Sequence, residues 1–98
     1  MTAYVIFEAD VTDTDRYERY KARAQASVEA AGGRYVARGG VVESFEGAEP
    51  ARVVILEFPT FAAASAWYHS DDYTEVKSLR AGAARARMFL VDGVDGVG

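Results

Sequence analysis

The chain has 98 residues, of which half are hydrophobic, and it carries a formal net charge of −4 and no cysteine. This length favours a single domain over residues 1–98, and the acidic balance argues against a nucleic-acid partner, because phosphate binding needs a basic surface. The lack of cysteine excludes disulfides, thiolate catalysis, iron–sulfur clusters and cysteine zinc sites. No apolar run approaches the roughly 20 residues of a membrane span, and the first residues lack a signal-peptide pattern. We therefore expect a cytoplasmic protein with no membrane partner.

The first half of the chain predicts a strand, a helix and a second strand. Residues 3–10 are rich in β-forming side chains. Between residues 12 and 31, apolar residues recur at helical spacing, which predicts a helix. Residues 12–14 are candidates for its N-cap, and the glycine pair at 32–33 ends it. The next strand is predicted from Arg34 to Phe45.

The second half predicts another strand, helical segments and a final strand. Residues 52–58 give the strongest strand signal, and Thr60 can cap the helix that follows. Ser70 can cap a short further helix that ends near Arg80, before a last strand and a loose glycine-rich tail over 94–98. The order β-α-β-β-α-β predicts an α+β, ferredoxin-like fold, with a four-stranded antiparallel sheet and two helices on one face.

The strands also predict a partner. In an antiparallel sheet with one face in water, apolar and polar residues should alternate along each strand. Residues 53–56 and 88–91 are instead apolar at odd and even positions alike, so both faces of these strands are apolar. The helices can cover only one face of the sheet. We therefore expect the other face to be covered by a second copy, giving a homodimer with its sheets face to face.

Several motifs, in this order and spacing, resemble one family. The stretches GGRYVARGG, EFP, AAASAWYHSDDY and LRAGA are similar to those of the domain-of-unknown-function 1330 family of small bacterial proteins. The family usually has Ser-Pro-Glu-Tyr where this chain has Ser-Asp-Asp-Tyr at 70–73. The resemblance implies a dimeric α/β-barrel, a superfamily that includes cofactor-independent monooxygenases, haem-degrading enzymes, lactone isomerases and sensory domains. It implies the fold rather than a reaction.

Arg38 stands out because it lies in a predicted strand directly before two glycines. If Gly40 lies opposite Glu57, Arg38 is the diagonal neighbour of that carboxylate on the sheet face away from the helices, where Glu8 can share the same space. Two interpretations are open. The pair could be a buried structural ion pair, or it could form a polar pocket in which Arg38 binds an anionic or carbonyl oxygen and Glu57 handles a proton.

A second candidate cluster is aromatic. Trp67 and Tyr68 near the second helix could belong to the core or could line one end of a pocket, with Tyr20 from the first helix beside them. Arg80 could be an anion anchor or could complement a helix dipole. We take Arg38, Trp67, Arg80 and Glu8 as ligand-binding candidates, and Glu57, Tyr68 and Tyr20 as catalytic candidates.

Metals and cofactors are not expected. His69 is the only histidine, and no His-x-x-x-His or Glu-x-x-His spacing accompanies it. The chain has no asparagine, so the Asn, Trp and His set of the haem-degrading relatives cannot be carried over.

The leading hypothesis is a dimeric α/β-barrel that binds a small polar or anionic metabolite between sheet and helices. One alternative is a cofactor-independent monooxygenase or isomerase. The other is a non-enzymatic dimerisation or sensory module.

Overall fold

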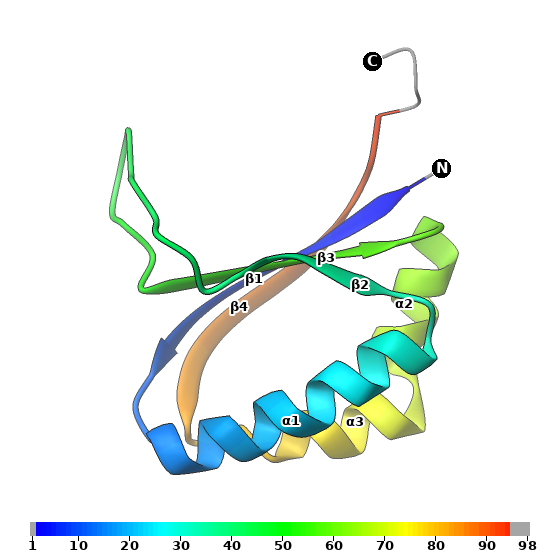
Figure 1. Ribbon diagram of the computed structural model, residues 1–98, viewed down its shortest axis with the longest axis horizontal. Coiled ribbons are helices and arrows are strands. Elements are labelled where there is room, and N and C mark those ends of the chain that lie inside the picture. Colours follow the sequence, from blue (N-terminus) through cyan, green and yellow to red (C-terminus); the bar gives the residue numbers. More distant parts are fainter. Residues whose placement is uncertain (1, 95–98) are drawn as a thin grey trace.

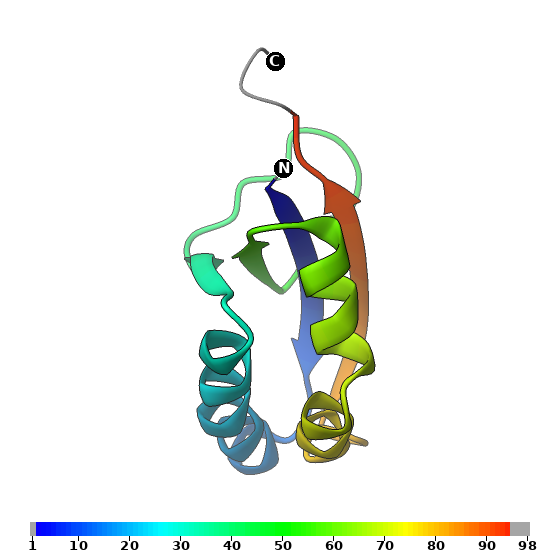
Figure 2. The same ribbon diagram turned by 90° about the vertical axis from the view of Figure 1, so that its right-hand side faces the viewer.

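The structure, a computed structural model, describes residues 2–94 and confirms the predicted order of elements, including the short helix predicted after Ser70. Four antiparallel strands form one sheet in the order β2-β3-β1-β4. All three helices lie on the same face of this sheet (Figure 1), α1 toward β2 and α2 toward β4 (Figure 2). The elements are β1 (Ala3–Val11), α1 (Thr14–Ala30), β2 (Arg34–Arg38), β3 (Arg52–Phe58), α2 (Phe61–His69), α3 (Asp71–Ser78) and β4 (Ala84–Asp92).

Side-chain caps set the starts of the helices. Asp13 accepts a hydrogen bond from the Arg16 backbone N–H at the start of α1, and Thr60 does the same for Ala63 at the start of α2. Ser70 caps α3, as predicted, by accepting from the Tyr73 backbone N–H. Each cap satisfies a backbone donor that has no partner within the helix.

The core lies between the sheet and the helices. On β1 and β3 every second residue is buried against the helices, which is the period that strands impose. The apolar stripe predicted for α1 faces them. The main core residues are Val5, Phe7, Ala9, Tyr17, Tyr20, Ala24, Val28, Val54, Leu56, Phe58, Ala64, Trp67, Tyr73 and Val76.

The second strand is much shorter than predicted. Pairing of β2 with β3 ends at Arg38, opposite Val54, with one last hydrogen bond from the Gly39 N–H to the Val53 carbonyl. Gly39 then adopts a φ of +67°, which turns the chain out of the sheet. Residues 40–51 form a loop that projects beyond the sheet, away from α1 (Figure 1).

Of the tail predicted to be loose, only Val94 lies within the described residues; 95–98 lie outside them. Within residues 2–94, no helix has both the length and the apolar character needed to cross a membrane.

Candidate functional site

The sheet face away from the helices, here named the outer face, carries three ion pairs. Each joins an arginine on one strand to a carboxylate on the neighbouring strand, where the register places them opposite each other. The pairs are Arg34–Glu57 at 2.7 Å, Arg87–Glu8 at 3.2 Å and Arg85–Asp10 at 2.7 Å. All three arginine side chains are largely exposed, so each pair stabilises the fold by at most about 1 kcal/mol.

The predicted pairing of Arg38 with Glu57 is wrong. Glu57 lies opposite Arg34, whereas Arg38 lies opposite Val54 on the helix side of the sheet. The cause is a one-residue register shift between Tyr35 and Ala37, where Val36 is the extra residue. A bulge of this kind inserts one residue and reverses the facing of every later side chain in the strand. Without it, Arg38 would point to the outer face, as predicted.

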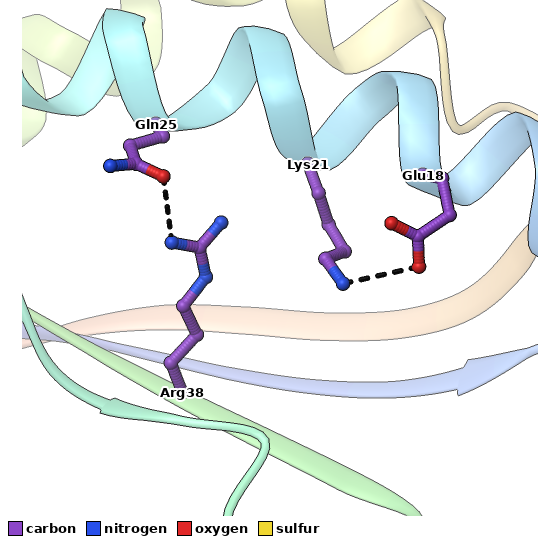
Figure 3. Close-up of polar contacts among 4 residues, drawn as sticks. All are labelled: Glu18, Lys21, Gln25 and Arg38. Atoms are coloured by element: carbon purple, nitrogen blue, oxygen red, sulfur yellow. Dashed lines mark hydrogen bonds and ion pairs between the residues drawn. The ribbon is translucent and has the colours of Figure 1, made fainter.

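On the helix side, Arg38 reaches from β2 across to α1 (Figure 3). Its Nη1 donates a hydrogen bond of 2.8 Å to Oε1 of Gln25, and its guanidinium lies 4.3 Å from the centre of the Tyr35 ring. One α1 turn earlier, Lys21 donates to Glu18 at 3.1 Å. Arg38 therefore has a neutral partner, not a carboxylate.

Arg52, at the start of β3, is a second cation on the helix side. Its guanidinium lies 5.8 Å from the centre of the Tyr17 ring, and its buried Nε has no hydrogen-bond partner within residues 2–94. The same guanidinium packs against Gly39, where an added Cβ would overlap it. Gly39 is therefore favoured by its positive φ, and a Cβ at this position would also make the Arg52 guanidinium shift.

Arg80, which follows α3, is a third cation without a carboxylate partner among residues 2–94. Its guanidinium lies 5.1 Å from the Phe7 ring centre and 5.4 Å from that of Tyr20. The hydroxyls of Tyr20 and Tyr73 are hydrogen-bonded to each other at 2.7 Å in the core. Burial raises the pKa of Tyr20 well above its ordinary value of 10, and the adjacent Tyr73 adds to this shift.

A small cavity of about 20 Å³ lies between α1 and the sheet. Arg38, Arg52 and Lys21 line it together with tyrosines and apolar core residues, and no carboxylate is among the lining residues. Burial raises the pKa of both lining tyrosines near the arginines, Tyr17 and Tyr35, although Arg52 and Arg38 partly offset the effect. These phenols are therefore neutral hydrogen-bond donors near neutral pH. The remaining lining residues are Phe7, Tyr20, Ala24, Val28, Val54, Leu56, Trp67 and Met88.

The structure brings together only part of the predicted site. Arg38, Tyr20 and Trp67 line the cavity, and Arg80 contacts Tyr20 at its edge. Trp67 is buried, and its Nε1 donates to the Ser27 hydroxyl at 3.2 Å, so its polar group is already used within the core.

Three candidates lie elsewhere. Glu8 and Glu57 are on the outer face in ion pairs. Tyr68 lines a separate groove of about 130 Å³ between α2 and β4, and its hydroxyl accepts a hydrogen bond from Lys77. Within residues 2–94, no three His, Asp or Glu side chains lie close enough together to hold a metal ion.

Sequence reasoning missed Arg52, Tyr17 and Tyr35 as site residues. The parity of β3 could have revealed Arg52, because it shares the facing of the buried Val54 and Leu56. The facing of Arg38 and Tyr35 relative to each other depends on the bulge, for which a stretch of ordinary strand residues gives no signal.

The fold matches solved structures across nearly the whole chain. A protein of unknown function from Rhodopseudomonas palustris has a TM-score of 0.75 at 20% identity, covering 96% of this chain and 83% of that chain. SnoaB, a cofactor-independent oxygenase from Streptomyces nogalater, has a TM-score of 0.61 at 12% identity, covering 98% and 94%. A proposed antibiotic biosynthesis monooxygenase from Nitrosomonas europaea has a TM-score of 0.56 at 19% identity, again covering 98% and 94%. At such identities the likeness shows the ferredoxin-like fold alone.

No curated protein matches the sequence. The family model described as "Domain of unknown function (DUF1330)" matches residues 2–94, which is nearly the whole chain. This match confirms the resemblance carried by the motifs, and the protein belongs to the DUF1330 family.

Proposed function

We propose that this protein binds a small anionic metabolite between α1 and the sheet, with Arg38 and Arg52 as its anchors. The observation that carries the proposal is a contrast among the five arginines on the strands. The three on the outer face each pair with a carboxylate, whereas the two on the helix side pair with none from residues 2–94. In a chain with a net charge of −4, two neighbouring arginines without counter-charges favour an anionic ligand.

The chemistry of the lining supports binding more than proton transfer. The phenols of Tyr17, Tyr20 and Tyr35 have raised pKa values and can donate hydrogen bonds to a ligand oxygen. The carboxylate that we considered as a base, Glu57, lies on the other face of the sheet. The site as built holds an anion and orients it.

The Arg38–Gln25 hydrogen bond can be exchanged for a hydrogen bond from Arg38 to a ligand. A neutral amide is a weaker partner for a guanidinium than a carboxylate is, since a carboxylate adds the attraction between opposite charges and can accept two parallel N–H bonds. An arriving anion can therefore replace Gln25 as the acceptor for Arg38. This exchange takes place at an exposed position, so it does not require the core to move.

We also propose that the protein is a homodimer that buries the outer face. Apolar side chains occupy the middle of this face, between the ion pairs, and two of them, Phe89 and Val91, are 41% and 48% exposed. A self-complementary two-fold interface would cover these side chains in both copies at once.

Native mass spectrometry of protein purified directly from cells tests the anion proposal. We expect the wild-type protein to retain a small anion, and both Arg38→Met and Arg52→Met to lose it. Arg85→Met is the matched control, because it removes an arginine from the outer face instead. Equal retention by all three variants would contradict the proposal.

A further inference from the structure

The size of the cavity limits what can enter it. Its volume of about 20 Å³ is room for roughly one water molecule or one methyl-sized group. The walls include Tyr17, Trp67 and Phe7, which are almost completely buried in the core. Interiors of this kind are close-packed, so an aromatic ring could enter only by displacing several side chains.

The arginines favour a planar anionic group. Arg38 lies over the Tyr35 ring and Arg52 lies over the Tyr17 ring, which leaves the edges of the guanidinium groups to make hydrogen bonds. The Nε of Arg52 has no partner within residues 2–94. The guanidinium edge matches a carboxylate, whose two oxygens it can bind side by side.

A phosphate-binding arrangement is not built here. Phosphate sites commonly use the free backbone N–H groups of a helix N-terminus or of a glycine-rich nest. None of the three helix caps, Asp13, Thr60 and Ser70, lines the cavity. The α1 residues that line it run from Tyr17 to Val28, beyond the first residues of that helix.

Part of the remaining lining is suited to a methyl group. Val54, Leu56, Met88 and Ala24 line the cavity and offer no charge and no side-chain donor. A methyl group packed against these four side chains would bury no polar group.

We infer that the ligand is a small monocarboxylate of about one or two carbons, with its carboxylate on Arg38 and Arg52 and at most a methyl group in the cavity, toward Val54 and Met88. This inference rests on the proposed anion site and narrows it to one chemical class. It requires the existing cavity and the exchange at Gln25, and no further opening of the core.

Titration of ¹⁵N-labelled protein with four probes tests the inference: sodium acetate, sodium butyrate, sodium benzoate and inorganic phosphate, at ionic strength held constant with sodium chloride. We expect saturable shifts of the β2 and β3 amides with acetate, at a dissociation constant about tenfold or more below those for butyrate, benzoate and phosphate. Arg38→Met should abolish the shifts. Arg38 is exposed, so this variant should still fold. It therefore tests the site even if Arg52→Met unfolds. Arg85→Met should bind as the wild type does.

The outcomes separate the two proposals. Butyrate, benzoate or phosphate binding as tightly as acetate, with the same dependence on Arg38, overturns the inference of a one- or two-carbon carboxylate, a size of roughly one methyl group beyond the carboxylate, and leaves the anion site in place. The absence of saturable binding for all four probes, in a protein that also retains no anion from cells, overturns both proposals.

Discussion

Arg38 and Gln25 join the sheet to α1 through one exposed hydrogen bond of 2.8 Å, and Gln25 is the acceptor of a guanidinium that has no carboxylate partner within residues 2–94 (Figure 3). A glutamate at this position would supply the missing charge from the protein itself. The residue type at position 25 therefore decides whether Arg38 is available to a ligand.

We expect Gln25→Glu to weaken acetate binding by about tenfold, because the new carboxylate competes for Arg38 and lowers the positive charge of the site by one. Gln25→Ala is the control. It removes the acceptor without adding charge, so acetate should bind at least as tightly as to the wild type. The same titrations give both dissociation constants, and equal weakening by the two variants would mean that Gln25 positions the ligand and does not compete with it.

The second prediction concerns two adjacent glycines with different roles. Gly39 has a φ of +67° and leaves no space for a Cβ beside Arg52, whereas nothing lies within 4 Å of a Cβ at Gly40. We expect Gly39→Ala to reduce the free energy of unfolding by about 1–2 kcal/mol from the backbone conformation alone, and to weaken acetate binding because Arg52 must move. Gly40→Ala should leave both unchanged. Urea denaturation and titration measure the two effects, and equal stability of the two variants would contradict this account of Gly39.

The third prediction follows from the raised pKa of Tyr20. The native protein keeps the Tyr20 proton above pH 10, whereas the unfolded chain loses it near the ordinary value of 10. The unfolded state therefore binds fewer protons, and stability must fall as the pH rises above 10, by about 1.4 kcal/mol per pH unit for this group. Below pH 10 the contribution is constant.

Tyr20→Phe tests this directly. At pH 8 it should lower the free energy of unfolding by about 1–3 kcal/mol, because the buried hydroxyl of Tyr73 loses its partner. Above pH 10 the difference between variant and wild type should shrink as the pH rises, since phenylalanine cannot ionise. Urea denaturation at pH 8, 10.5 and 11 measures the difference, and a constant gap across this range would show that Tyr20 does not resist ionisation in the native state.

The sequence was sufficient for the fold because its signals are local. Caps such as Asp13, Thr60 and Ser70 lie where the pattern of apolar residues begins, and β3 lies where residues 52–58 give the strongest strand signal. The site depended on one feature that is not local. At the bulge, Tyr35 and Ala37 pair with the adjacent residues Leu56 and Ile55, and Val36 has no partner on β3. This one extra residue moves Arg38 from the outer face to the helix side. The sequence therefore drew attention to Arg38 but predicted the wrong face and the wrong partner for it.

The apolar part of the outer face motivates the last prediction. Ile6 on β1 lies opposite Ile55 on β3 and, on its other side, opposite Phe89 on β4. These three side chains form a continuous apolar stripe across the outer face. Ion pairs flank this stripe along the strands, Arg34–Glu57 on one side and Arg87–Glu8 on the other. An apolar centre with a polar rim is the usual composition of a protein–protein interface.

We expect the wild-type protein to sediment at micromolar concentration with twice the mass of one chain, and Ile55→Asp to sediment as a monomer, because each dimer would bury two unpaired carboxylates at the centre of its interface. Val41→Asp is the matched control, since Val41 is fully exposed on the loop that leaves the sheet, and it should remain dimeric. Ile55 is only partly buried in the single chain, so the variant should still fold, which its far-UV circular dichroism would establish. A wild-type monomer, or an Ile55→Asp dimer as stable as that of Val41→Asp, would mean that the outer face is not the interface.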